Sequence, residues 1–307
     1  MNHSIKKVSI IGLGALGVMY AEHLSQKINF EDLRIIADQN RIDSYKEEGV
    51  YCNGEKCHFN YVAPDAVVEP ADLLIVAVKY NQLQEAIQAV KHHLGENTII
   101  LSVLNGIESE RDIAKVYGEK HNLYCVAQGM TASKVGNQMT YKNKGMLCFG
   151  ELDENKNSEK VERLKKFFDE VEMPYEINNQ MAIKLWSKLM INVGVNQTVA
   201  YFGGTNKIIQ KESPEREMMI AAMKEVQIVA EKEGIIIEDK EIDYWLEIMG
   251  SLNPDGMPSM AQDVEAKRYS EVELFAGTIV RLGKKHSLSV PVNTEFNRYF
   301  NELEAGY

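Results

Sequence analysis

The chain has 307 residues, of which 45% are hydrophobic, and carries 34 Lys and Arg residues against 45 Asp and Glu residues. The net charge of −11, without a basic tract, argues against a nucleic-acid partner, which would require a positive surface. No apolar run reaches the roughly 18 residues that a membrane span needs, and the first residues lack a secretory signal. We therefore expect a cytoplasmic protein of two domains with no membrane contact.

The first motif is a glycine-rich turn between a predicted strand and a predicted helix. A β-branched run at Val8–Ile11 leads into GLGALG, and apolar residues then continue at helical spacing. This order is typical of a dinucleotide site, because the turn admits a pyrophosphate and the helix N-terminus faces its charge. An ordinary tight turn is the alternative. The predicted cofactor-binding residues of the turn are Gly12, Leu13, Gly14, Ala15, Leu16 and Gly17.

Buried strands and helices alternate through the first half of the chain. After the glycine turn we expect strands at 33–37, 72–79, 98–104 and 123–128, and helices at about 15–27, 41–48, 81–93 and 108–116. This alternation predicts a doubly wound parallel sheet. Residues 50–62 predict a hairpin, and residues 139–149 predict an antiparallel addition that turns at 142–145.

Beyond residue 178 the chain is predicted to be helical almost throughout. After a helix at 158–171 and a short edge strand at 174–177, the predicted helices are 179–201, 214–233, 238–250, 258–286 and 293–304. The fold class is therefore α/β. An N-terminal Rossmann-type doubly wound parallel sheet, the dinucleotide-binding domain at 1–178, is followed by an all-α C-terminal domain for substrate binding and catalysis at 179–307.

The choice between NAD and NADP depends on two residues that follow the second predicted strand. Asp38 ends that strand, where a carboxylate that accepts from the ribose of NAD is expected. Arg41 follows three residues later and is suited to the 2′-phosphate of NADP. The two residues point to opposite cofactors.

The predicted helix at 179–201 carries polar residues on an otherwise apolar surface. Lys188, Asn192 and Asn196 are spaced four residues apart and share one stripe. Buried amides and a buried ammonium need hydrogen-bond partners, because burying them without partners costs free energy. We therefore infer that these side chains bind a ligand. A polar face bonded to a neighbouring helix is the alternative. A second polar cluster begins at Ser259, where Asp263 and Lys267 have the spacing of a helical ion pair. A solvated surface is the more common interpretation of such charges.

The four cysteines, Cys52, Cys57, Cys125 and Cys148, form no CxxC pair. Cys52 and Cys57 flank the turn signal Asn53-Gly54, which would let them face each other across two strands. A zinc site would need more ligands at suitable spacing. We expect reduced thiols and no metal.

Five motifs in a fixed order give the chain a family resemblance. They are GLGALG at 12–17, VAVKY at 76–80, LNG at 104–106, LWSKLMINVGVN at 185–196 and PSMAQDVEAKRYSEVE at 258–273. With them the chain resembles the ketopantoate reductases (2-dehydropantoate 2-reductases) from Val8 to about Asn301. The resemblance implies an NAD(P)-dependent oxidoreductase that reduces a small-molecule 2-keto acid, ketopantoate, to D-pantoate in pantothenate and coenzyme A biosynthesis.

The resemblance also implies roles for single residues. Lys188 matches the catalytic lysine that donates a proton to the keto oxygen. Glu271 matches the active-site acid that interacts with the substrate hydroxyl, beside the cofactor. Lys79 and Asn105 match positions at the nicotinamide end of the cofactor, and Asn105 also contacts substrate.

Three further matches concern the substrate. Asn192 and Asn196 match substrate-binding amides, and Ser259 matches the residue that binds the substrate carboxylate. Gln197 departs from the family pattern, because many members have proline after this asparagine.

The cofactor and the substrate each keep an alternative. Many family members carry arginine where Asp38 stands, so the family favours NADP(H) while Asp38 keeps NAD(H) open. A reductase of another branched or aromatic 2-keto acid, that is a 2-hydroxyacid dehydrogenase of the same fold, is the second candidate function. A nucleotide-sensing protein without turnover is the third. The helical half could form a homodimer or pack on itself.

Overall fold

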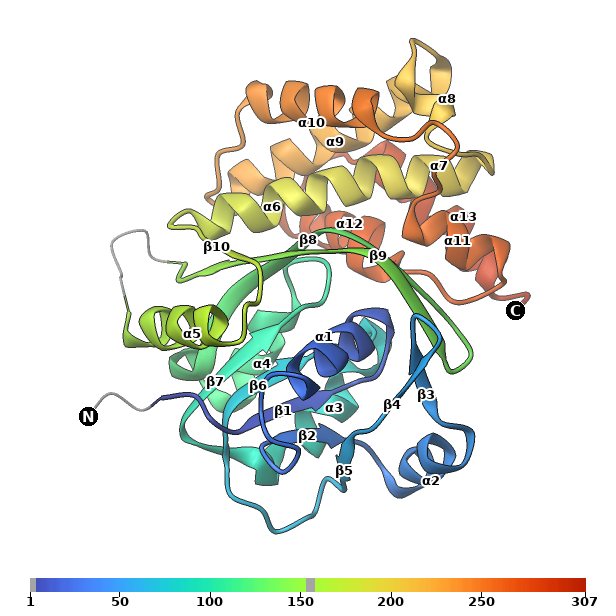
Figure 1. Ribbon diagram of the computed structural model, residues 1–307. Coiled ribbons are helices and arrows are strands. Elements are labelled where there is room, and N and C mark those ends of the chain that lie inside the picture. Colours follow the sequence, from blue (N-terminus) through green and yellow to red (C-terminus); the bar gives the residue numbers. More distant parts are fainter. Residues whose placement is uncertain (1–3, 153–157) are drawn as a thin grey trace. The chain divides into compact units, whose positions relative to one another are not determined.

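The computed structural model describes residues 4–152 and 158–307, which divide into two compact units between Met181 and Ala182. The sequence places the domain boundary at 178. The first unit is built around a sheet and the second consists of helices (Figure 1). Of the helices within the described ranges, none combines the length and the apolar character that crossing a membrane requires.

The sheet of the first unit has a parallel part with Rossmann order. In the described residues the strands are β1 (Val8–Ile11), β2 (Leu33–Ile36), β3 (Val50–Cys52), β4 (Glu55–Cys57), β5 (Asn60–Val62), β6 (Ala71–Val76), β7 (Leu94–Ser102), β8 (Asn122–Val135), β9 (Gln138–Gly150) and β10 (Tyr175–Ile177). The parallel strands lie in the order β5-β2-β1-β6-β7-β8. Numbered along the chain this is 3-2-1-4-5-6, which confirms the predicted fold class.

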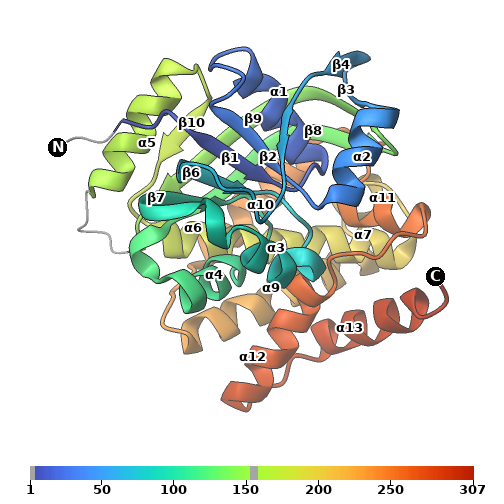
Figure 2. The same cartoon turned by 90° about the horizontal axis from the view of Figure 1, so that it is seen from below.

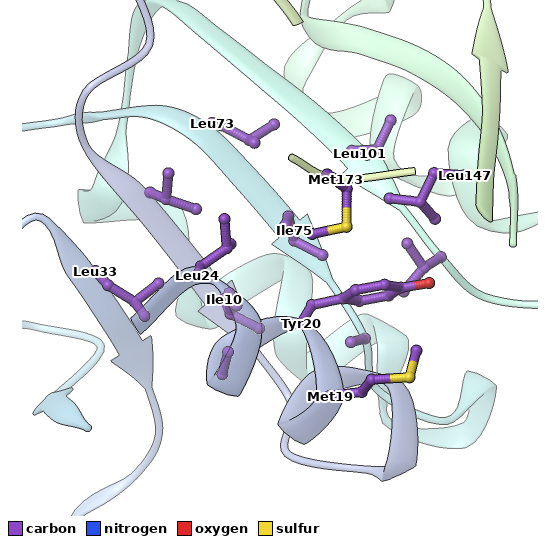
Figure 3. Close-up of a cluster of buried hydrophobic side chains, with 14 of the residues drawn as sticks. Ile10, Met19, Tyr20, Leu24, Leu33, Leu73, Ile75, Leu101, Leu147 and Met173 are labelled. Atoms are coloured by element: carbon purple, nitrogen blue, oxygen red, sulfur yellow. The ribbon is translucent and has the colours of Figure 1, made fainter. Parts of the chain in front are cut away.

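Helices cover both faces of this parallel part (Figures 1 and 2). They are α1 (Ala15–Ser25), α2 (Gln39–Glu48), α3 (Leu83–Ala89), α4 (Ser109–Tyr117) and α5 (Glu159–Glu170), with short 3₁₀ turns η1 (Tyr80–Gln82), η2 (Lys91–His93) and η3 (Glu119–His121). Side chains alternate across a strand, so Ile10 packs with α1 and α5 on one face and Ile11 with α3 and α4 on the other. Figure 3 shows part of the first of these two cores.

The hairpin predicted at residues 50–62 is shorter than expected. β3 and β4 form it around Asn53-Gly54, but β5 leaves it and pairs in parallel with β2. Cys52 lies opposite Glu55 in the register, so the prediction that it faces Cys57 was wrong. All four cysteines are free thiols.

The turn predicted at 142–145 was also wrong, because these residues lie inside the long strand β9. β9 pairs with β8 antiparallel, and the register shifts by one residue between Thr131 and Ala132. Gly145 has φ +63, and a Cβ there would lie 2.2 Å from the carbonyl oxygen of Gln128. The glycine that suggested a turn is thus required by the close approach of the two strands at this position.

The second unit consists of helices interrupted by two π-helical turns. Its elements are α6 (Met181–Ile191), η4 (Asn192–Asn196), α7 (Gln197–Phe202), α8 (Lys207–Gln210), α9 (Pro214–Lys232), α10 (Asp239–Ser251), α11 (Ser259–Glu265), η5 (Glu273–Gly277), α12 (Thr278–His286) and α13 (Pro291–Glu304). α6, the π-turn η4 and α7 form one continuous rod (Figure 1). The single helix predicted at 258–286 was wrong, because α11 stops at Glu265 and Lys267 adopts φ +50.

Glu110, in α4, is a buried acid in the core of the first unit. Only 2% of its surface is exposed, and the Ser109 hydroxyl donates to its Oε2 at 2.7 Å. Burial raises its pKa from 4.5 to about 7. Between these pH values the folded protein keeps a proton that the unfolded chain has lost, so the carboxyl destabilises the fold as pH rises.

We predict that Glu110→Gln, which cannot ionise, gains stability relative to the wild type as pH rises from about 4.5 to about 7. The gain in free energy of unfolding should approach about 3 kcal/mol. Urea unfolding of both proteins at pH 5 and pH 8 measures it. A difference between the two proteins that is the same at both pH values would contradict the prediction.

Candidate active site

The glycine turn after β1 is shaped by contacts that exclude larger residues. Gly12 has φ +97, and a Cβ there would lie 2.7 Å from the carbonyl carbon of Ala77, just beyond β6. A Cβ on Gly17 would lie 1.9 Å from the carbonyl oxygen of Gly12, so α1 packs directly on the turn. β1 and β6 are the neighbours at which the strand order reverses, where open α/β sheets bind ligands.

The first turn of α1 is suited to a phosphate. Its N-cap is Gly14, which is exposed and has no side chain that could cap the helix. Ala15 and Leu16, the first helical residues, are half-buried. Their backbone N–H groups and the helix dipole offer positive partial charge to an anion. The residues therefore fit the pyrophosphate of a dinucleotide.

A hollow beside the turn runs from the carboxyl ends of β1 and β2 to one face of α3. Its lining includes Gly12 and Leu13 from the turn, Asp38 and Arg41 after β2, and Glu85 from α3. Its remaining lining residues are Ile11, Ile35, Ile36, Ala37, Tyr45, Pro64, Val78, Gln82, Ala86 and Ala89. A largely apolar hollow with a few polar groups fits a nucleoside.

The two residues expected to select the cofactor are bonded to each other. Asp38 is the N-cap of α2, and its Oδ1 accepts from the backbone N–H of Arg41 at 3.0 Å. Its Oδ2 lies 3.3 Å from Nε of Arg41, and both side chains are about half exposed. An exposed ion pair of this kind contributes at most about 1 kcal/mol, so a ligand can compete for either partner.

Lys79 and Asn105 follow the carboxyl ends of two neighbouring strands. Lys79 is exposed and precedes η1, three residues after β6 ends. Asn105 is half-buried in the loop between β7 and α4. Since β6 and β7 pair in parallel, both residues follow strand ends at one edge of the sheet. Neither lines the hollow that holds Asp38.

In the second unit, the polar stripe of α6 continues into a π-helical turn. Lys188 is half-buried in α6, and Asn196 is half-buried at the end of η4. Asn192, the first residue of η4, is only 4% exposed, and its Nδ2 has no hydrogen-bond partner within the described part of the chain. A buried N–H without a partner is costly, and π-turns are frequent at functional sites.

The pKa of Lys188 reflects two opposed influences. Burial lowers it below the ordinary 10.5, and the positive charge of Lys184 lowers it further. The negative charge of Glu271 raises it. Glu271 precedes η5 and is half-buried. The structure thus brings the two residues predicted to be catalytic within electrostatic reach of each other.

Ser259 is the first residue of α11 and is exposed. α11, which begins with Ser259, packs against α7 and η4. η4, which begins with Asn192, packs against η5, two residues after Glu271. The pairing of Asp263 with Lys267 stays a prediction. Asp263 accepts from Nε of Arg268 at 2.8 Å.

Sequence reasoning missed two features of these sites. Gln82, which ends η1, and Glu85, in α3, line the hollow, and their position shortly after the VAVKY motif was the available signal. Gln197 is fully buried and bonds to η4 and η5. The sequence shows that Gln197 departs from the family pattern after Asn196, but it does not predict a contact with η5.

A glycine turn that fits a dinucleotide in the first unit and a half-buried lysine with a lowered pKa in the second are typical of a nicotinamide-dependent oxidoreductase. Two family models agree with this class. The model described as Ketopantoate reductase PanE/ApbA matches residues 8–154, and the one described as Ketopantoate reductase PanE/ApbA C terminal matches residues 180–304. The chain belongs to the ketopantoate reductase family.

Relatives and solved structures are similar over nearly the full chain. The 2-dehydropantoate 2-reductase of Streptococcus pyogenes serotype M3 is 25% identical over 301 residues, 96% of each chain. D-mandelate dehydrogenase in complex with NADH has a TM-score of 0.85 at 22% identity, covering 98% of this chain and 99% of that one. Dimeric ketopantoate reductase from Staphylococcus aureus has a TM-score of 0.78 at 21% identity, with coverage of 98% and 99%.

We predict that Gly17→Ala weakens NADH binding by at least about tenfold, a loss of about 1.4 kcal/mol, because its Cβ would force α1 away from the turn. Fluorescence titration with NADH measures the affinity. Gly250→Ala is the matched control, because a Cβ there meets nothing within 4 Å. Wild-type affinity in Gly17→Ala would show that the packing of α1 on the turn does not matter for binding.

Proposed function

We propose that the protein is a 2-dehydropantoate 2-reductase, which reduces ketopantoate to D-pantoate with a nicotinamide cofactor. The observation that carries the proposal is the half-buried Lys188, whose pKa is lowered by burial and raised by Glu271. Membership of the ketopantoate reductase family and the full-length similarity to a 2-dehydropantoate 2-reductase support this substrate.

The N-terminal domain would hold the cofactor and the C-terminal domain would supply the proton. When bound, the nicotinamide supplies the hydride that reduces the ketone. Lys188 stabilises the negative charge that develops on the keto oxygen and donates the proton to it. Burial lowers the pKa of Lys188 and makes that proton easier to give up, while the negative charge of Glu271 raises the pKa.

Three further residues of the C-terminal domain would bind the keto acid. The Nδ2 atom of Asn192 is buried and donates to none of the described residues, so it can donate a hydrogen bond to a substrate oxygen. Asn196 lies one π-turn further on and offers a second amide. Ser259, exposed on the neighbouring α11, offers a hydroxyl for the carboxylate.

For the cofactor, the charges around the hollow support NAD(H) rather than the NADP(H) that the family resemblance favours. Asp38 and Glu85 line the hollow, and Arg41 is the single cationic side chain among its described lining residues. Arg41 is already paired with Asp38. A 2′-phosphate would meet two carboxylates for one guanidinium, whereas a ribose hydroxyl can donate to Asp38.

Assembly and location remain predictions. A homodimer is supported by the S. aureus ketopantoate reductase, which is described as dimeric. The cytoplasmic location is predicted from the sequence.

We predict that Lys188→Ala lowers kcat for ketopantoate by at least about 10²-fold, the scale of general-acid catalysis. Oxidation of the reduced cofactor, followed at 340 nm, measures the rate. Lys184→Ala is the matched control, since it removes a lysine one turn away on the same helix and should keep most of the activity. Normal turnover in Lys188→Ala would overturn the lysine assignment. A wild type that strongly prefers another branched or aromatic 2-keto acid would overturn the substrate.

We predict that kcat/KM is at least about tenfold higher with NADH than with NADPH, since two carboxylates repel the phosphate. Asp38→Asn and Glu85→Gln each remove one negative charge from the hollow. Each should therefore lower the ratio of kcat/KM with NADH to kcat/KM with NADPH. Asp43→Asn is the control, because Asp43 lies on α2 outside the hollow. Preference of the wild type for NADPH would contradict the charge argument.

A further inference from the structure

Two π-helical turns lie next to the residues proposed for the active site. η4 contains Asn192 and Asn196, and η5 begins two residues after Glu271. A π-turn departs from the regular hydrogen bonding of an α-helix and leaves backbone groups that need other partners. η4 and η5 pack against each other in the second unit.

The side chain of Gln197 bonds to the backbone of both turns. Its Nε2 donates to the carbonyl oxygen of Val193, in η4, at 2.9 Å. Its Oε1 accepts from the backbone N–H of Ala276, in η5, at 3.0 Å. Gln197 has no exposed surface, so water cannot replace either bond.

We propose that Gln197 is a positioning residue, which joins Val193 to Ala276 and so holds Glu271 at its place relative to Lys188. The inference rests on the proposed function in taking Lys188 as the proton donor. The backbone carbonyl of Glu271 itself accepts from Leu274 and Phe275 at the start of η5, so a displacement of η5 moves Glu271 with it.

The consequence of losing the link is a lower pKa of Lys188. Burial and Lys184 lower this pKa, and Glu271 is the charge that opposes them. Glu241, on α10, lies on the side of α6 that carries Ser187 and accepts from the Ser187 hydroxyl at 2.8 Å. If Glu271 moves away, the lowering influences remain and Lys188 loses its proton at a lower pH.

The test compares Gln197→Met with the wild type. Methionine has nearly the length of glutamine but makes neither hydrogen bond. Asn293→Leu is the matched control, because Asn293 is also fully buried in the helical unit and donates to Ala222 and Glu225 of α9 rather than to η4 or η5. Gln197→Asn, whose shorter amide cannot reach both partners, replaces the methionine variant if that variant does not fold.

The first readout is independent of catalysis. Trace labelling of the whole protein with acetic anhydride across a pH series, followed by mass spectrometry of the peptide that contains Lys188, gives the pKa of this amine. The second readout is the pH at which kcat/KM for ketopantoate falls on the alkaline side. In Gln197→Met both should move down by at least about half a pH unit, and in Asn293→Leu neither should move.

The outcomes separate the two proposals. An unchanged Lys188 pKa in folded Gln197→Met, or an equal change in Asn293→Leu, overturns the positioning role. A wild type that does not reduce ketopantoate overturns the proposed function, while the labelling result still decides the role of Gln197.

Discussion

The proposed proton donation by Lys188 depends on one electrostatic balance, between the burial of Lys188 and the charge of Glu271. A buried ammonium tends to lose its proton, and a nearby carboxylate restores it. Neither influence alone suits a proton donor: a fully solvated lysine holds its proton too tightly, and an unopposed buried one loses it. Asn192 begins the π-turn η4, Glu271 precedes the π-turn η5, and Gln197 bonds to both turns.

The N-terminal unit is organised by a steric constraint. Gly12 and Gly17 allow β1, β6 and α1 to meet more closely than any side chain permits. That contact leaves the first turn of α1 without a side-chain cap at the point where the strand order reverses. The same edge of the sheet carries Asp38, Arg41 and Glu85, whose net negative charge bears on the choice between the two dinucleotides.

The sequence predicted the features that depend on local pattern. Apolar runs at 8–11 and 72–79 predicted two strands, which the structure has as β1 and β6 in the centre of the sheet, and their alternation with helices predicted a doubly wound parallel sheet. Features that depend on distant contacts were missed or wrong. Gly145 suggested a turn in the sequence. In the structure this position is glycine because a side chain would collide with the backbone of Gln128 on the opposite strand. Lys267 ended a helix that periodicity would have continued. The bond from Gln197 to Ala276 joins residues 79 positions apart, which local pattern does not reveal.

The measurement that tests the central claim most directly is the pH dependence of kcat/KM for ketopantoate reduction by the wild-type protein. The account predicts that activity falls on the alkaline side with an apparent pKa below 10.5, the ordinary value for lysine, because burial outweighs the charge of Glu271. Activity that stays constant up to pH 10.5 would contradict it, since Lys188 would then not be the proton donor in the state described.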